Sequence, residues 1–135
     1  MDINQKGCFA EYKFVTKAME SGFNVSMPLL GSSPYDCILE KDNLMYKFQV
    51  KYMSDNRYTS NKQKTPQIEI KSGKKYYSKE QVDFFAVWHE KHKGFFILPN
   101  NGQKAFRLCV TNKYKENFNN FNICLLYTSP SPRDS

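Results

Sequence analysis

Two strand-like segments joined by a short polar turn constrain the fold of this chain more than any other feature. Residues 45–52 alternate strictly between two sides, which is the two-residue period of a half-buried strand. One side carries Tyr46, Phe48, Val50 and Tyr52. The other side carries Met45, Lys47, Gln49 and Lys51. Residues 35–40 predict a second strand, and the turn-forming run Lys41-Asp42-Asn43 predicts that the two strands form a hairpin.

Pairing these strands is expected to bring Asp36 beside Gln49 and Lys51, all on one face. A carboxylate, an amide oxygen and an ammonium at a strand pair are the parts of a divalent-metal phosphodiesterase site. Residues 3–21 predict a helix that ends before Gly22 and whose apolar stripe is Ala10, Phe14, Val15, Ala18 and Met19. Glu11 lies on or beside the core-facing edge of that helix. Alone it would be interpreted as a capped or salt-bridged helix residue, and it can also turn towards Asp36.

These residues resemble the PD-(D/E)XK nuclease core, with Gln49 in place of the usual second acidic residue. The order is Glu11, then Asp36, then Gln49-x-Lys51. Their flanks resemble the group I intron-encoded homing endonucleases of this superfamily, the kind found in bacterial tRNA introns. The flanking runs are Lys6-Gly7, Ala10-Glu11, Gly22-Phe23-Asn24-Val25, Met27-Pro28, Tyr35-Asp36, Phe48-Gln49-Val50-Lys51 and Val82-Asp83-Phe84-Phe85. The resemblance covers about residues 1–100 and implies an α/β, restriction-endonuclease-like core with a mixed central β-sheet flanked by helices.

The resemblance also implies hydrolysis of double-stranded DNA by a water that Mg²⁺ or Mn²⁺ activates. Asp36 and the backbone carbonyl of Val50 would bind the metal, and Glu11 would complete its outer shell or hold a second ion. Lys51 would orient the water or help to deprotonate it. Gln49 offers a neutral oxygen, so weaker metal binding is expected. Since the similar intron endonucleases share this change, Gln49 does not indicate a dead site.

A basic stretch follows the candidate site. The chain has 20 Lys and Arg against 13 Asp and Glu, and its net charge of +7 favours an anionic partner, nucleic acid or membrane surface. Residues 55–75 place cations among amide and hydroxyl side chains, a composition suited to phosphate and groove contacts. A solvated loop is the bland interpretation. Proximity to the candidate site favours DNA contact, through Arg57, Asn61, Lys62, Gln63, Lys64, Lys71, Lys74 and Lys75.

Other function classes find little support in the sequence. No apolar run approaches the ~20 residues of a membrane span, and the N-terminus is too polar for a secretory signal. The four cysteines form no C-x-x-C pair and lie far from the histidines, which argues against a zinc site. We therefore expect a cytoplasmic protein acting at the nucleoid, not a secreted one. His89 and His92 fall in a polar turn and are expected to be exposed and not catalytic.

The rest of the chain predicts one domain over residues 1–123. Strands are expected at 23–27, 67–71, 82–88, 95–98 and 105–110, with a helical turn at 78–81 and the start of a helix within 112–122. A loop containing Gly31-Ser32-Ser33 leads into Asp36, and its small residues would let a DNA backbone approach. Residues 124–135 resemble a translated sequencing-library adapter, so the biological chain is expected to break off near Ile123.

Two alternatives to a homing endonuclease stay open. A junction resolvase, a repair enzyme or a restriction-like enzyme would use the same core. A non-catalytic, basic nucleic-acid-binding domain would leave Gln49 and Lys51 as ordinary exposed strand residues. Because cleaving both strands of a duplex needs two active sites, we expect a homodimer or homotetramer.

Overall fold

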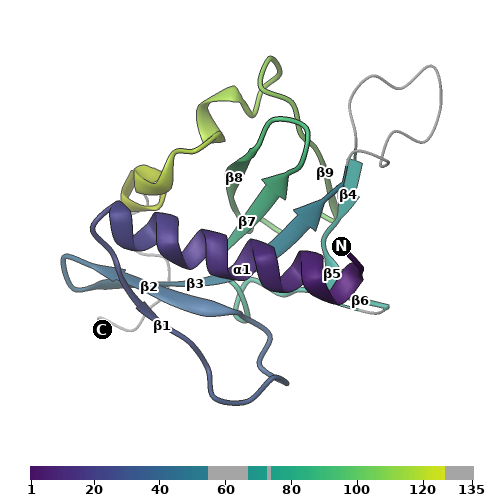
Figure 1. The fold of residues 1–135 in the computed structure, drawn as a ribbon. Coiled ribbons are helices and arrows are strands. Elements are labelled where there is room, and N and C mark those ends of the chain that lie inside the picture. The colour runs from purple at the N-terminus through teal and green to yellow at the C-terminus, as the bar shows by residue number, and fades with distance from the viewer. Residues whose placement is uncertain (55–66, 73, 127–135) are drawn as a thin grey trace, which may run out of the picture.

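A five-stranded mixed sheet crossed by one long helix forms the body of the molecule (Figure 1). The computed structural model describes residues 1–54, 67–72 and 74–126. The sheet order is β1-β2-β3-β7-β8, and two further pairs are β4-β9 and β5-β6. The elements are α1 (Ile3–Glu20), β1 (Asn24–Ser26), β2 (Cys37–Lys41), β3 (Leu44–Met53), β4 (Gln67–Glu69), β5 (Lys71–Ser72), β6 (Lys75–Tyr76), β7 (Phe84–His89), β8 (Gly94–Pro99), β9 (Ala105–Arg107), η2 (Lys115–Asn117) and η3 (Phe121–Leu126).

The predicted hairpin is confirmed as β2 and β3. The two strands pair antiparallel from Cys37 opposite Phe48 to Lys41 opposite Leu44. Asp42 and Asn43 form the two-residue turn with φ values of 55° and 66°, the left-handed region that Asp and Asn tolerate best. Strand β2 begins two residues later than predicted, which leaves Asp36 outside the ladder.

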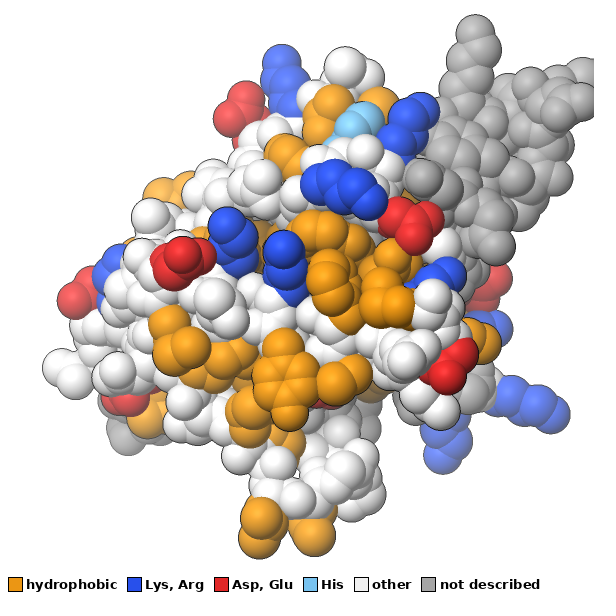
Figure 2. Space-filling view, viewed as in Figure 1, with side chains coloured by type: hydrophobic (Ala, Val, Ile, Leu, Met, Phe, Trp, Pro, Cys, Tyr) orange, Lys and Arg blue, Asp and Glu red, His pale blue; other side chains and the backbone are white. Residues whose placement is uncertain are grey.

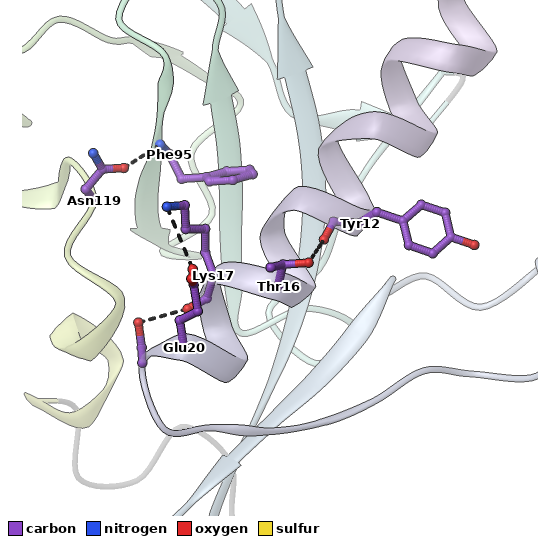
Figure 3. Close-up of polar contacts among 7 residues, drawn as sticks. Tyr12, Thr16, Lys17, Glu20, Phe95 and Asn119 are labelled. Atoms are coloured by element: carbon purple, nitrogen blue, oxygen red, sulfur yellow. Dashed lines mark hydrogen bonds and ion pairs between the residues drawn. The ribbon is translucent and has the colours of Figure 1, made fainter.

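The predicted N-terminal helix is confirmed as α1. Asp2 and Gln5 form a reciprocal capping box at its start. At its end Gly22 adopts a φ of 93°, as predicted for the glycine after a helix. A salt bridge of 3.7 Å joins Lys17 to Glu20 in the last turn (Figure 3).

The apolar stripe of α1 is narrower than predicted. Ala10, Phe14 and Ala18 are buried against the sheet. Met19, expected in the same stripe, is 54% exposed. That prediction is wrong because one residue advances about 100° around a helix, which turns Met19 away from the face that Ala18 occupies.

Both faces of the sheet are covered by apolar clusters. One cluster lies under α1 and includes its residues Phe14 and Ala18, and the other covers the opposite, second face of the sheet. Successive residues of β7 alternate between them: Phe84 and Ala86 belong to the cluster under α1, and Phe85 and Val87 belong to the cluster on the second face. Strands β3 and β7 run parallel and the other neighbours antiparallel, so the sheet is mixed as predicted. Among the described residues, the second face is covered by the β4-β9 pair and adjoining loops, whose apolar side chains include Ile68. No described α-helix lies there, but Tyr114 and Phe118, which flank the 3₁₀ helix η2, pack against this cluster.

His89 corrects a prediction, since it is only 2% exposed. Strand β7 continues one residue beyond the predicted end at residue 88, and His89 lies two residues after Val87, on the second face. Its Nε2 lies 3.3 Å from the Leu108 carbonyl, and its Nδ1 accepts a 3.4 Å hydrogen bond from the backbone N–H of His92. His92 itself is half-buried, so the expected exposed turn is wrong for both rings.

The C-terminal segment folds over the β8 edge without the expected helix. Residues 112–122 contain the 3₁₀ helix η2 and the start of η3, with no α-helix. Asn119 forms two hydrogen bonds with Phe95 of β8, as a neighbouring strand would. Its Oδ1 accepts from the Phe95 N–H at 2.9 Å (Figure 3), and its own N–H donates to the Phe95 carbonyl at 2.6 Å. Residues 78–81 likewise form a hydrogen-bonded turn, not a helix.

Residue Cys124 is fully buried in the cluster under α1. Residues 127–135 lie outside the described part of the chain. The interpretation of residues 124–135 as an adapter-derived tail stays a prediction. Within the described ranges, no helix is long and apolar enough to cross a membrane.

Candidate active site

The site begins where β2 stops pairing with β3. Cys37 opposite Phe48 is the last pair of that ladder, so the second half of β3 runs on beyond β2. Asp36, immediately outside the ladder, donates its N–H to the Phe48 carbonyl at 2.8 Å. Its Oδ2 accepts the Val50 N–H, also at 2.8 Å. The carboxylate thus occupies the place that a further residue of β2 would take.

The same geometry orients the Val50 carbonyl. In a β-strand the N–H and C=O of one residue point towards the same neighbouring strand. Since the Val50 N–H meets Asp36, its carbonyl points towards the same open edge of β3. A main-chain oxygen and a carboxylate therefore lie at one edge.

Asp36 and Gln49 line one pocket of about 480 Å³. The loop before β2 forms one wall, and the β5-β6 hairpin with the turn after it forms the other. The remaining lining residues are Gly31, Ser32, Ser33, Pro34, Lys75, Tyr76, Tyr77 and Gln81. Small and hydroxyl-bearing residues thus face a basic, aromatic hairpin across the carboxylate.

Lys51 lies next to this pocket on the same face of β3 as Gln49. Its Nζ donates to the Lys71 carbonyl at 3.0 Å and lies 5.2 Å from the centre of the Tyr77 ring. Burial raises the pKa of Asp36, and the positive charge of Lys51 acts in the opposite direction without cancelling that rise. The ammonium is therefore held by the hairpin while it acts electrostatically on the carboxylate.

Glu11, on α1, does not line this pocket but a separate shallow groove, and its carboxylate interacts electrostatically with that of Asp36. Burial raises the pKa of Glu11 above the ordinary value, and the negative charge of Asp36 raises it further. Burial also raises the pKa of Asp36, although the Val50 hydrogen bond and Lys51 act in the opposite direction. Burial raises the pKa of the Cys37 thiol to about 12, with smaller contributions from both carboxylates. Glu11 and Asp36 thus form a pair of acids that repel each other, while Cys37 is inert packing.

The profile of the PD-(D/E)XK endonuclease family matches residues 1–127. This chain belongs to the PD-(D/E)XK endonuclease family. Its fold is similar to that of the bacterial homing endonuclease I-Ssp6803I, with a TM-score of 0.73, 18% sequence identity, and coverage of 93% of this chain and 95% of that one. The predicted restriction-endonuclease-like fold is therefore confirmed.

A weaker likeness is to Hjc, a Holliday junction resolvase from the archaeal hyperthermophile Archaeoglobus fulgidus. The TM-score is 0.49, with 14% identity over 76% of this chain and 83% of that one. No curated protein sequence matches the chain.

The oxygen donors of this PD-(D/E)XK site fit a hard divalent cation. Asp36, Glu11, the Val50 carbonyl and the Gln49 amide supply the carboxylate, carbonyl and amide oxygens that Mg²⁺ prefers. A cation between Glu11 and Asp36 would also offset their repulsion. In the described part of the chain no three His, Cys, Asp or Glu side chains come together as a metal cluster. The donor set contains only two acids.

Only part of the predicted DNA-contact set lies within the described residues. Lys75 lines the pocket, Lys74 is exposed beside it, and Lys71 forms a 2.9 Å salt bridge with Glu69. Arg57, Asn61, Lys62, Gln63 and Lys64 lie outside the described residues.

Sequence reasoning missed three side chains that line the pocket, Tyr76, Tyr77 and Gln81. Tyr76 and Tyr77 carry no motif, and Gln81 was noted only as the end of the predicted helical turn at 78–81. Their position depends on the β5-β6 hairpin folding back over β3, and no local pattern predicts that contact.

Proposed function

We propose that this PD-(D/E)XK family member is a divalent-metal-dependent endonuclease that hydrolyses phosphodiester bonds in double-stranded DNA. One observation carries the proposal: Asp36 and Gln49 share a pocket at the open edge of β3, with Glu11 electrostatically coupled to Asp36. Such acids with raised pKa values in a concave site are typical of catalytic centres. The likeness in fold to a bacterial homing endonuclease supports the narrower proposal of an intron-encoded homing enzyme.

In the proposed mechanism, Asp36 and the Val50 carbonyl would hold Mg²⁺ or Mn²⁺, and Glu11 would supply a second carboxylate from α1. When bound, the ion would supply positive charge for the phosphate and make water a better nucleophile. Lys51 orients the attacking water or helps to remove its proton. Gln49 contributes a neutral oxygen and leaves the site one negative charge short of the usual family pattern.

The hairpin and the loop before β2 form the proposed DNA groove. Lys74 and Lys75 would neutralise phosphates beside the pocket, and the small side chains of residues 31–33 would let the backbone approach. We extend the groove to Lys71 and to the basic residues between Arg57 and Lys64, which the sequence predicts as DNA contacts.

A homodimer or homotetramer is the proposed assembly, because one active site cuts one strand. One flank of α1 carries no lysine and presents Cys8, Tyr12, Val15 and Met19 at spacings of four and three residues, with the Glu11 carboxylate at its edge. Tyr12 is 65% exposed and points away from the sheet in Figure 3. Figure 2 shows hydrophobic side chains gathered below the helix and lysines along its upper side. This apolar flank is the surface on which a second copy would pack.

Nicking of supercoiled plasmid tests the proposal. The wild-type chain should nick in Mg²⁺ and stop in EDTA, and Lys51→Met should lose more than a hundred-fold in rate while plasmid binding stays within a few-fold. Lys115→Met, which removes an exposed ammonium on η2, is the matched control and should nick normally. Metal-independent nicking, or full activity of folded Lys51→Met, would overturn the site.

A four-way DNA junction separates the alternatives. A homing enzyme should cut a linear duplex at a defined site and gain nothing from a branch. A resolvase should prefer the junction, and binding without any cleavage would identify a non-catalytic DNA-binding domain.

A further inference from the structure

The ammonium of Lys51 is held between the two ends of one small hairpin. Its Nζ donates to the Lys71 carbonyl at 3.0 Å and lies 5.2 Å from the centre of the Tyr77 ring. Lys71 begins β5 and pairs with Tyr76 on β6, so Tyr77 directly follows the residue opposite Lys71. A backbone oxygen and an aromatic face therefore contact the ammonium from adjacent positions of the β5-β6 pair.

Tyr77 connects this contact to both the core and the pocket. Its half-buried ring lies 5.9 Å from that of Phe85, which is fully buried on β7. The same residue lines the pocket that Asp36 and Gln49 share. Because Phe85 fixes the ring from behind, the ring is a rigid surface against which the lysine can rest.

A lysine needs such a surface to act at a defined point. Its side chain is a compact charge on a flexible four-carbon stem, and much rotamer entropy is lost when it is held. Catalysis depends on holding reacting groups close to the productive geometry. An aromatic face attracts the ammonium without neutralising it, so the charge stays available to the phosphate or the water.

We infer that Tyr77 is a positioning residue for Lys51, and that its ring and the Lys71 carbonyl together set where the ammonium points. The inference rests on the proposed nuclease function for its catalytic consequence only. The placement of the ammonium itself is a property of the folded chain and is measurable without DNA.

The first test compares three variants in single-turnover plasmid nicking. Tyr77→Phe keeps the ring and should nick within about two-fold of wild type. Tyr77→Leu removes the ring and should nick about ten-fold more slowly at saturating DNA, the equivalent of about 1.4 kcal/mol in barrier height. Its half-saturating DNA concentration should not change, because the lysine, not the DNA contact, is displaced.

Tyr114→Leu is the matched control. The Tyr114 ring packs against buried Phe106 at 5.6 Å and has the Lys113 ammonium over it at 5.1 Å, yet it lines a different pocket. Replacing Tyr114 removes an equivalent aromatic ring, with an equivalent contact to a buried phenylalanine and to an ammonium, at a position outside the site. Equal rate losses in both leucine variants would mean general destabilisation and overturn the positioning role. A faster Tyr77→Leu would mean that the ring restrains Lys51 from acting, which also overturns it.

The second test reads the ammonium directly. Reductive methylation of the folded, DNA-free protein, followed by peptide mass spectrometry, measures how accessible each lysine amine is. Lys51 should be methylated several-fold faster in Tyr77→Leu than in wild type, and unchanged in Tyr77→Phe and Tyr114→Leu. An unchanged Lys51 rate in Tyr77→Leu would overturn the inference. If the wild type fails to nick DNA, the nuclease proposal falls while this second test still decides the placement.

Discussion

Asp36 is kept at the open edge of β3 at a cost to the folded state, and this cost is measurable. Burial raises its pKa above 3.8, so the folded chain binds the proton more tightly than the unfolded chain does. Stability is therefore lost as pH rises from 3.8 through the raised pKa, and it stays lost above that window. Asp36→Asn removes the charge and keeps an oxygen that accepts the Val50 N–H. We expect a higher melting temperature at pH 8 together with more than a hundred-fold loss of nicking.

The pH dependence distinguishes this effect from a general one. The stability gain of Asp36→Asn should shrink as pH falls towards 3.8, where the wild-type carboxyl becomes neutral as well. Glu80→Gln removes an exposed carboxylate and is the control, with little change expected at any pH. Thermal melts across pH measure both variants. A lower melting temperature for Asp36→Asn at pH 8 would contradict the assigned burial cost.

Gln49 is where the site departs from the usual family pattern. Gln49→Glu restores a carboxylate beside Asp36 in the same pocket. We expect half-maximal nicking at a several-fold lower Mg²⁺ concentration, because another anionic oxygen binds the cation. Without metal the variant should melt at a lower temperature, since it adds a third negative charge near Glu11 and Asp36. Gln103→Glu, at a position that does not line this pocket, should change neither value. An unchanged Mg²⁺ requirement in Gln49→Glu would show that Gln49 does not contact the metal.

For single residues, the sequence predicts which side chains lie together within one hairpin, but few contacts beyond it. Asp36 and Gln49 lie together because the alternation of β3 and the turn at Asp42 and Asn43 fix the register locally. Tyr77 joins them from a segment that is distant in sequence, and its position depends on tertiary packing. His89 was mispredicted because its polar neighbours are typical of a turn, whereas its two ring nitrogens find partners inside the fold.

Among the elements, the β5-β6 hairpin supplies the described lysines of the proposed DNA groove. Lys74 and Lys75 are both exposed on it. Lys74→Ala combined with Lys75→Ala should reduce the log–log salt slope of DNA binding by about 2 units, at about 0.9 per phosphate contact. Stability should change by less than about half a kcal/mol, since both side chains are exposed. Binding isotherms at several salt concentrations measure the slope.

The matched control removes the same charge elsewhere. Lys113→Ala with Lys115→Ala changes two exposed lysines around η2 and should leave the slope close to that of wild type. Equal slopes for both double variants would mean that the hairpin lysines act only through net charge. Lys62 and Lys64 lie outside the described residues. Replacing both with Ala should reduce the salt slope of DNA binding by the same amount, measured in the same way.

The helices and strands that could be predicted are those whose caps, turn residues and periodicity lie within their own sequence. The helix α1 and the hairpin β2-β3 carry caps, turn residues and periodicity in their own sequence. Strands β4 and β9 pair Gln67 with Arg107, although the two residues are far apart in sequence. These strands come together because their apolar side chains cover the second face of the sheet. The polar run at 112–122 has helix-like spacing, but Asn119 bonds to β8 instead, and that contact interrupts the helix.

The whole molecule divides its charge unevenly around α1. Lys6, Lys13 and Lys17 lie along one flank, and the flank that carries Tyr12 and Met19 has no lysine and one carboxylate, Glu11, at its edge. Ile3, Tyr12 and Met27 also line one shallow groove with Glu11, so this area continues from the helix to the loop after β1 and contains one carboxylate but no lysine. A chain with a net charge of +7 repels its own copies over most of its surface. This area is where two copies can approach without opposing lysines.

A twofold dimer through this area presents the same residues from both copies, so each substitution acts twice. Tyr12→Lys combined with Met19→Lys places up to four ammonium groups in the contact, and we expect the dimer dissociation constant to rise at least a hundred-fold. Sedimentation velocity over a range of protein concentrations measures this without DNA. Asn101→Lys with Asn122→Lys adds the same charge at exposed positions that do not line this groove and should still dimerise. The α1 double variant should also nick plasmid but yield little linear product, because paired cuts need paired sites. A monomeric wild type, or equal dimerisation of both double variants, would show that this flank of α1 is not the contact between copies.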